Sequence, residues 1–191
     1  MTDVIVRQTN DLSRIVDEFS RFARMPEPDR RSEDIIEILN SAVSLQETGF
    51  PKISFKRNII KSPLIYELDS TMISQALINL LKNAGEAIES RINNDNHPEV
   101  FGQIEVNAIS TENTVKISIV DNGVGLPEDR NRLFEPYVTT RENGTGLGLA
   151  IVKKIIEEHG GMFSLEDAPP FSDTGIVGAA AVIELPFYNS N

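Results

Sequence analysis

The sequence contains no cysteine and only two histidines. Without cysteine the chain can form no disulfide, no thiolate nucleophile and no cysteine-based zinc site. Basic residues are also scarce, since 18 lysines and arginines against 29 acidic residues give a net charge of -11. A nucleic-acid backbone is held mainly by Lys and Arg. We therefore expect no nucleic-acid partner, and any phosphate that the chain binds must be held by local geometry or by a metal ion.

Long apolar runs are missing as well. No stretch approaches the ~20 consecutive apolar residues that cross a bilayer, and the first residues do not resemble a signal peptide. The composition, with 40% hydrophobic and 25% charged residues, is that of a soluble globular protein. We therefore expect a cytoplasmic chain that meets a membrane only through a longer parent protein.

Apolar side chains recur at alternating three- and four-residue steps along residues 2–24, a pattern that predicts a helix packed against other helices. The members of this stripe are Ile5, Leu12, Ile15, Phe19 and Phe22. Pro26 and Pro28 follow it, and proline cannot continue a helix. We therefore predict a boundary that divides the chain into residues 1–28 and 29–191.

The second part shows alternating helical and strand patterns. Helices are predicted over 32–47 with Ser32 as N-cap, over about 70–92 with Asp69 or Ser70 as N-cap, and over 145–159. Strands are predicted over 52–60, 63–68, 102–110, 114–120, 162–167 and 176–185. This order predicts an α+β two-layer sandwich, in which helices cover one face of a mixed, mostly antiparallel sheet, preceded by one long helix. Residues 121–144 lack a regular pattern, and loops of this length are usually lids or binding segments.

Three clusters of candidate functional residues frame that loop. The first, Asn79-Leu80-Leu81-Lys82-Asn83-Ala84, lies on the long helix. The two asparagines are four residues apart and share one helix face, although amides are poor helix formers. Mg²⁺ takes oxygen ligands and often only one or two from the protein, so a metal site explains the pair. A solvated polar stripe explains it equally well.

The second cluster, Asp121-Asn122-Gly123-Val124-Gly125, follows an apolar strand directly. A carboxylate at a strand end can accept a hydrogen bond from an exocyclic amine such as adenine N6, and the glycines let the backbone approach a flat ring. The alternative is a type I′ hairpin turn, for which Asp-Asn-Gly is a strong signal. The long loop that follows, in place of a second alternating strand, argues against the hairpin.

The third cluster, Gly144-Thr145-Gly146-Leu147-Gly148, opens a helix. A glycine-rich entry into a helix presents free N–H groups and the positive end of the dipole to phosphate. Its G-x-G-x-G spacing differs from the dinucleotide-binding fingerprint, and the chain contains no P-loop sequence. A glycine-rich loop without a ligand is the remaining alternative.

In this order, and together with Leu133-Phe134-Glu135-Pro136-Tyr137, the three clusters resemble the N, G1, F and G2 boxes of the histidine-kinase catalytic domain, within the Bergerat-fold ATPase and kinase superfamily. The likeness covers residues 69–186 and, more loosely, 32–68. Residues 8–26 resemble the second helix of a dimerisation and histidine-phosphotransfer hairpin. With residues 135–161 they are similar to NtrY-type nitrogen-regulation sensor kinases.

The resemblance implies that the chain binds ATP and Mg²⁺. Asn83 and Asn79 would hold the metal, and Asp121 would bind the adenine amino group. The other nucleotide-site residues that the resemblance implies are Gly123, Gly125, Phe134, Thr140, Gly144, Thr145, Gly146, Leu147 and Gly148, with Lys82 and Arg141 near the phosphates. In one departure, Glu86 stands where many members of the family carry a basic residue.

The activity implied is that of a protein-histidine kinase, which passes the γ-phosphate of ATP to a histidine and ultimately to a response regulator, here of the NtrX type. The family's acceptor motif, H-E-x-x-N-P, does not occur in the sequence. His97 lies in a turn and His159 at a helix end, so we expect structural roles for both. The chain should therefore bind ATP without autophosphorylating. The parent kinase would be an inner-membrane sensor that dimerises through the front helix.

Two other functions remain open. Bergerat-fold ATPases that hydrolyse ATP carry a Glu one turn before the metal-binding Asn, where it activates water as a general base. The corresponding residue here is Asn79, which cannot remove a proton, and this favours phosphotransfer. A nucleotide-binding interaction module without catalysis is the third possibility.

Overall fold

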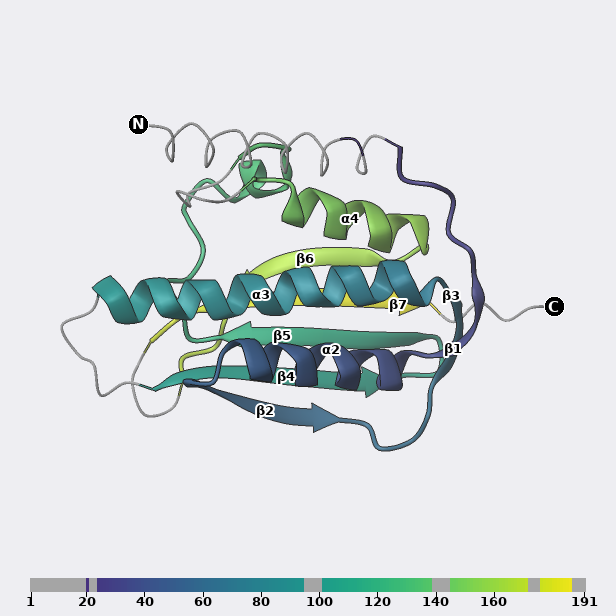
Figure 1. Cartoon of the computed structure of the whole chain (residues 1–191), viewed down its shortest axis with the longest axis horizontal. Coiled ribbons are helices and arrows are strands. Elements are labelled where there is room, and N and C mark those ends of the chain that lie inside the picture. Colours follow the sequence, from purple (N-terminus) through teal and green to yellow (C-terminus); the bar gives the residue numbers. More distant parts are fainter. Residues whose placement is uncertain (1–19, 21–23, 95–100, 139–144, 172–175, 187–191) are drawn as a thin grey trace, which may run out of the picture.

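The computed structural model describes residues 20, 24–94, 101–138, 145–171 and 176–186 (Figure 1). The predicted front helix therefore lies almost wholly outside the described residues, as does His97. Within the described part of the chain, no helix is long and apolar enough to cross a membrane.

A five-stranded mixed sheet forms one layer of the molecule, in the order β2-β4-β5-β7-β6. Its strands are β2 (Ile53–Ile59), β4 (Gly102–Ser110), β5 (Thr114–Asp121), β7 (Ala179–Pro186) and β6 (Met162–Asp167). The β2–β4 pair is parallel and the other pairs are antiparallel. Strands β1 (Arg31–Asp34) and β3 (Ile65–Leu68) form a separate antiparallel pair. The predicted mixed, mostly antiparallel sheet is confirmed.

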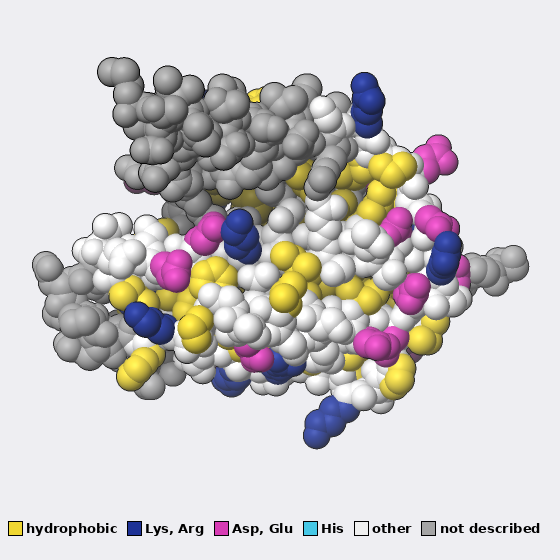
Figure 2. All heavy atoms as spheres, viewed as in Figure 1, with side chains coloured by type: hydrophobic (Ala, Val, Ile, Leu, Met, Phe, Trp, Pro, Cys, Tyr) yellow, Lys and Arg dark blue, Asp and Glu magenta, His cyan; other side chains and the backbone are white. Residues whose placement is uncertain are grey.

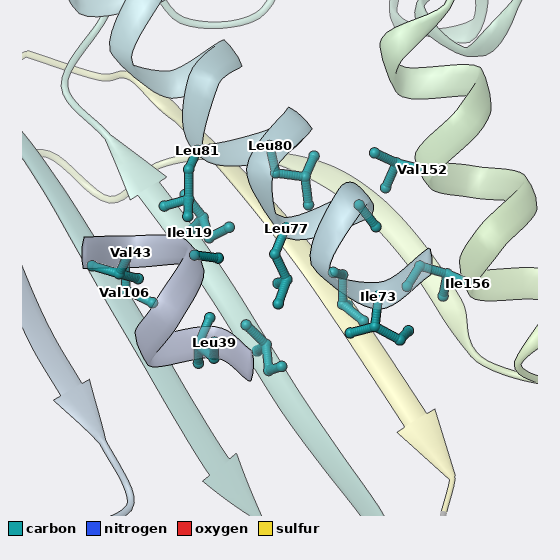
Figure 3. Packing of buried hydrophobic residues seen from close by; sticks show 14 of the residues in the cluster. Leu39, Val43, Ile73, Leu77, Leu80, Leu81, Val106, Ile119, Val152 and Ile156 are labelled. Atoms are coloured by element: carbon teal, nitrogen blue, oxygen red, sulfur yellow. The ribbon is translucent and has the colours of Figure 1, made fainter. Parts of the chain in front are cut away.

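Three helices, α2 (Ile35–Gly49), α3 (Ser70–Asn94) and α4 (Gly148–Glu158), cover one face of this sheet (Figure 1). Strand β4 explains the layering, since Ile104, Val106 and Ala108 are buried while the residues between them are more exposed. Figure 3 shows Leu39 and Val43 of α2 and Leu77 and Leu81 of α3 on the side of these helices that faces the strands. The two-layer α+β sandwich is therefore confirmed. Acidic and basic side chains are interspersed over the outer surface of the helix layer (Figure 2).

Several predicted boundaries were wrong, and tertiary contacts explain the differences. Ser32 is not the N-cap of α2, because it lies in β1, where it pairs with Glu67 of β3. The cap is Asp34, whose Oδ1 accepts hydrogen bonds from the N–H groups of Ile36 and Leu64. A carboxylate that serves both a helix start and a neighbouring segment cannot be recognised from local sequence alone.

The other differences concern segment ends. Helix α4 begins at Gly148 instead of residue 145, and β7 begins at Ala179 instead of residue 176. The loop predicted to be irregular contains a short 3₁₀ helix, η1 (Arg130–Phe134). Of the two N-caps proposed for α3, Asp69 is correct, since its Oδ1 accepts hydrogen bonds from the N–H groups of Thr71 and Met72.

His159 connects the C-terminal end of α4 to the start of α3. Its buried ring has Nδ1 2.7 Å from the carbonyl oxygen of Ile155, and Nε2 accepts a hydrogen bond from the N–H of Asp69 at 3.0 Å. Desolvation is the main cause that lowers the pKa of His159, and the nearby Arg30 lowers it further. The predicted structural role agrees with this placement, since the ring links the carbonyl of Ile155 to the backbone N–H of Asp69.

Candidate functional site

Helix α3 carries the first group of predicted site residues on a face that is not fully buried. Asn79 and Asn83 are half-buried, one turn apart, and Lys82 is exposed. The opposite side of the helix is anchored in the core by Leu80, Leu81 and Ala84. Because the buried face fixes the rotation of the helix, both amides are directed to the same side.

Lys82 is not an isolated cation. Its Nζ lies 3.7 Å from Oε1 of Glu86, one turn further along α3, and the two side chains are 58% and 34% exposed. Glu86 is the residue that replaces the basic side chain found in many members of the family. Glu86 partly offsets the positive charge of Lys82, the only lysine on this turn of the helix.

Asn79 and Asn83 supply the amide oxygens with which this face of α3 could hold a metal ion. Among the described residues, no group of three or more His, Asp or Glu side chains could hold a metal ion. Asn79 and Asn83 present two neutral oxygen donors, which fits Mg²⁺ because this ion keeps several waters and takes further oxygens from substrate phosphates. A softer metal that prefers imidazole or thiolate ligands has no such donor set here.

Asp121 is the last residue of β5, and only 5% of it is exposed. Its Oδ1 accepts a hydrogen bond of 2.8 Å from the backbone N–H of Gly123. That bond orients the carboxylate within a tight local turn. The alternative of a hairpin turn is excluded, because β5 pairs with β4 and β7 and no strand directly follows residue 125.

Two glycines allow the backbone around Asp121 to pack closely. A Cβ added to Gly123 would lie 2.7 Å from Ala87 of α3, so this glycine lets the β5 end touch the helix that carries the two asparagines. A Cβ added to Gly178 would lie 1.8 Å from the carbonyl oxygen of Asp121. The sequence reasoning missed Gly178. The sequence did carry a signal for Gly178, because a glycine near the start of a predicted strand often marks a close backbone approach.

The loop after Asp121 returns to the third cluster through a backbone contact. Gly146 has a φ of +68°, and its carbonyl oxygen accepts a hydrogen bond of 3.1 Å from the N–H of Tyr137. A Cβ on Gly146 would lie 2.6 Å from the carbonyl carbon of Tyr137. The two segments that flank residues 139–144 are therefore joined, and both glycine conformation and absence of a side chain are required at residue 146.

Phe134 anchors the same loop from its other side. Its ring packs edge to face on Phe163 of β6, with centroids 5.6 Å apart, and Nζ of Lys153 lies 5.3 Å from the ring centroid. Nearby, Arg130 forms two 2.8 Å hydrogen bonds with the carboxylate of Asp167. These contacts attach the base of the loop to α4 and β6.

The N-terminal tip of α4 is held by a buried side chain. Leu147, the residue before the helix, is fully buried, and its N–H donates to Oγ1 of Thr145 at 3.4 Å. Apart from its chain neighbours and the backbone of its own helix, no described atom lies within 4 Å of a Cβ built on Gly148. The first N–H groups of a helix have no partner within the helix, so this tip offers donors and a positive dipole end to an anion.

These features meet through α3, which contacts both β5 and α4. Figure 3 shows Leu80 of α3 directed toward Val152 of α4. The structure thus joins the asparagine helix to the Asp121 segment through Gly123 and to the glycine-rich helix through the core. Gly125, with a φ of +75°, lies next to the carbonyl oxygen of Val177. The predicted site residues Thr140, Arg141 and Gly144 lie outside the described part of the chain.

Comparison with known proteins supports the same interpretation. The family described as histidine kinase-, DNA gyrase B- and HSP90-like ATPase matches residues 68–189. The chain is 52% identical over 171 residues to the nitrogen regulation protein NtrY of Azorhizobium caulinodans. The aligned region covers 88% of this chain and 21% of that protein. It therefore spans about a fifth of the length of this relative. The resemblance to NtrY-type kinases that the sequence indicated is confirmed.

Two solved structures share the architecture. The full-length ShkA structure in complex with AMPPNP matches with a TM-score of 0.74 and 27% identity, over 96% of this chain and 38% of that one. The complex of histidine kinase ThkA with the response regulator TrrA matches with a TM-score of 0.71 and 27% identity, over 97% of this chain and 50% of that one. With a family match across residues 68–189 and a fold shared with histidine kinase ThkA, the chain belongs to the histidine kinase-, DNA gyrase B- and HSP90-like ATPase family.

Proposed function

We propose that this chain is the ATP-binding catalytic part of an NtrY-type sensor histidine kinase, a protein-histidine kinase that transfers the γ-phosphoryl group of ATP to a histidine. The observation that carries the proposal is the buried carboxylate of Asp121, oriented by Gly123 and packed through that glycine against the helix that bears Asn79 and Asn83. The similarity to NtrY and to ShkA in complex with AMPPNP supports it.

The end of β5 and the residues directly after it would recognise the base. The carboxylate of Asp121 is an acceptor, so it selects a base that carries an exocyclic amino group, as adenine does. Because one of its oxygens is already bound to the N–H of Gly123, the carboxylate needs little reorganisation on binding. Gly123 and Gly125 keep side chains away from the ring, and Leu147 supports the adjacent helix tip from below.

Helix α3 and the N-terminal tip of α4 would bind the phosphates. Asn83, with Asn79 one turn earlier, would hold Mg²⁺, which neutralises charge on the transferred phosphoryl group when bound. The backbone N–H groups at Thr145 to Gly148 would donate to phosphate oxygens. Lys82 would contribute a positive charge, reduced by its ion pair with Glu86. Phe134 would fix the base of the loop that carries Thr140, Arg141 and Gly144.

The residue types favour transfer over hydrolysis. An ATPase of this family needs a general base near the attacking water, and the residue one turn before Asn83 is an amide, which cannot remove a proton. Positioning and charge stabilisation are sufficient for phosphoryl transfer to a histidine that a separate segment presents. Neither histidine of this chain suits that role, because His159 is buried between two helices and His97 stands in a turn sequence.

The partners follow from the relatives. We propose an NtrX-type response regulator as the final phosphate acceptor, in line with the ThkA complex with its regulator. We also propose that residues 1–28 belong to the dimerisation and histidine-phosphotransfer segment of the parent kinase, that this segment pairs two copies, and that residues 29–191 form the catalytic domain. The parent would be an inner-membrane sensor with this domain on the cytoplasmic side.

Nucleotide titration by calorimetry tests the proposal. Wild-type protein should bind ATP with Mg²⁺, and Asp121→Asn should bind at least about tenfold more weakly, because an amide presents a donor to the amino group and a hydrogen bond to a charged group contributes ~1.5–3 kcal/mol. Asn107→Ala is a matched control, since Asn107 bonds Asn58 and Ser118 within the sheet. No binding heat with well-folded wild type would reject the proposal.

A transfer assay separates kinase from ATPase. The chain is mixed with a partner protein that carries the histidine-bearing helix, together with labelled ATP and Mg²⁺. A kinase puts label on the partner, and Asn83→Ala should abolish it. Release of inorganic phosphate that does not depend on the partner would instead indicate an ATPase.

A further inference from the structure

Asn122 is the polar residue of the second cluster that neither the resemblance nor the proposed function uses. It is 3% exposed, and all its described hydrogen bonds run to the start of β4. Its Nδ2 donates to the carbonyl oxygen of Phe101 at 2.9 Å, and its Oδ1 accepts from the N–H of Gln103 at 2.8 Å. Its backbone N–H donates to the carbonyl oxygen of Gln103 at 3.2 Å. The side chain is therefore directed away from a ligand and into the sheet.

These bonds continue the β4–β5 pairing beyond its last backbone pair. The ladder ends where Ile104 lies opposite Asp121, and the residue after β5, Asn122, holds Gln103 through both its backbone N–H and its side-chain amide. An amide carries both an acceptor and a donor, so Asn122 can bridge a carbonyl and an N–H on one strand. A carboxylate would keep the acceptor and lose the donor, and a serine is too short to reach both.

The bridge restrains the backbone on which Asp121 depends. On one side, residue 122 is bound to β4 by the three bonds described above. On the other side, the carbonyl oxygen of Asp121 packs against the Cα of Gly178, where no Cβ could fit. The N–H of Gly123, directly after Asn122, then donates to the Asp121 carboxylate. A shift of residue 122 would therefore move both the carboxylate and the N–H that orients it.

We propose that Asn122 is a positioning residue for base recognition: by bridging Phe101 and Gln103 it holds residues 121–123 in the conformation in which Asp121 binds the 6-amino group of ATP. This inference rests on the proposed function. It differs from a purely structural role because it predicts a loss of selectivity among bases, and not merely a loss of stability.

The experiment compares two nucleotides on Asn122→Ala and wild type by calorimetry with Mg²⁺. One probe is ATP, and the other is purine riboside triphosphate, which lacks the 6-amino group. Wild type should prefer ATP by about tenfold or more, the range of a hydrogen bond to a charged group. Asn122→Ala should lose most of that preference, with the affinity for the purine analogue changed less than about twofold. Equal weakening of both nucleotides, or an unchanged preference, would overturn the inference.

Asn107→Ala is the matched control. Asn107 lies on β4, the strand that Asn122 contacts, and its side chain joins β4 to both neighbouring strands. Its Oδ1 accepts from Nδ2 of Asn58 at 2.8 Å, and its Nδ2 donates to Oγ of Ser118 at 3.1 Å. These bonds lie on the sheet face away from the helices. It should lose a similar amount of thermal stability and keep the ATP preference of wild type. A control that lost the preference as well would show that any loosening of β4 has this effect, and would overturn the specific role of Asn122.

Two additional measurements keep the test decisive. In Asn122→Asp the side chain keeps its size and the oxygen that accepts from Gln103, so this variant replaces Asn122→Ala if the alanine variant unfolds, and it too should lose the ATP preference. In a double-mutant cycle, adding Asn122→Ala to Asp121→Asn should cost little further ATP affinity, because the group being positioned is already changed. Additive losses would contradict the proposal.

The outcomes also separate this inference from the function on which it rests. If folded wild type bound neither nucleotide, or bound ATP without preference over the purine analogue, the proposed reading of the base by Asp121 would fail. If wild type preferred ATP and folded Asn122→Ala and Asn122→Asp retained that preference, only the role of Asn122 would fail.

Discussion

The two ends of the α3–α4 helix pair are built in opposite ways. At the end where α3 starts and α4 stops, polar groups are satisfied by one another. Asp69 caps α3 through Oδ1, accepts from the N–H of Asp29 through Oδ2 at 3.1 Å, and donates its own N–H to His159. Arg30 adds a hydrogen bond of 2.6 Å to the carbonyl oxygen of Glu158. Residues 29 and 30 are thereby tied to both helices.

At the other end the close contacts are made by backbone and glycine. Gly123 meets α3, Gly178 meets Asp121, and Gly146 meets Tyr137, each at a distance that leaves no room for a Cβ. Polar side chains at this end, such as Asn79 and Asn83, lie on the partly exposed face of α3. One end is therefore stabilised by internal hydrogen bonds, whereas the other relies on close backbone and glycine contacts to hold its segments together.

The largest expected effect comes from filling a glycine contact. Gly178→Val places a side chain where the carbonyl oxygen of Asp121 would be 1.8 Å from its Cβ, so the backbone must shift. We expect a loss of ~1–3 kcal/mol or more of unfolding free energy together with loss of ATP binding. Thermal melting and calorimetry measure both. Gly49→Ala at the end of α2 is the control, because the nearest atom to a Cβ built there is 4.0 Å away. Wild-type binding by Gly178→Val would show that the close approach is dispensable.

The next effect concerns the unfolding free energy and arises at the end where α3 starts and α4 stops. Asp69→Ala removes the N-cap of α3 and the acceptor for Asp29, and should cost about 1–2 kcal/mol of unfolding free energy, measured by urea denaturation. ATP affinity of the folded variant should stay near that of wild type, since the two ends are separate. Asp129→Ala is matched to it, because Asp129 precedes η1 without a capping hydrogen bond. A large drop in ATP affinity in Asp69→Ala would break the proposed separation.

A smaller effect is a dependence of the unfolding free energy on pH, which arises from His159 at the same end of the helix pair. The pKa of His159 is lowered in the folded protein, mainly by desolvation, with an ordinary value near 6.5 in the unfolded chain. Below that value the unfolded state binds the proton more readily, so the unfolding free energy should fall as the pH decreases from about 6.5. Protonation would also remove the acceptor that Nε2 offers to Asp69.

His159→Gln isolates this contribution, because glutamine does not titrate. The difference in unfolding free energy between wild type and His159→Gln should narrow as the pH is lowered from 7 toward 5, in parallel urea titrations. A difference that stays constant or widens over that interval would contradict a lowered pKa.

The smallest expected effect is at the base of the loop. Arg130→Ala removes a largely exposed ion pair with Asp167, and such pairs contribute about 0–1 kcal/mol. We expect a melting temperature close to that of wild type, with any loss reduced further in high salt. Arg132→Ala, which breaks a longer 3.7 Å contact with Glu135, should have no larger effect. A loss well above 1 kcal/mol would mean that the loop is anchored by charge rather than by Phe134.

Local patterns predicted most of the elements. The alternation of Ile104, Val106 and Ala108 identified β4, and the apolar face of α3 identified that helix to within two residues of its end. The clusters at Asn79, Asp121 and Gly144 also came from sequence alone, because a paired amide, a strand-end carboxylate and a glycine-rich helix entry have recognisable local signatures. Their roles remain proposals.

The sequence by itself determined most of the segments that form helices and strands, which faces are buried, and which residue types could bind a nucleotide, since periodicity and local backbone preference are properties of neighbouring residues. Tertiary structure alone decided that β2 runs parallel to β4, that Asp34 and not Ser32 caps α2, that Asn122 bonds the start of β4, and that Gly178 lies against Asp121. Each of these depends on a backbone group from a distant part of the chain, and no local pattern specifies which group will arrive there.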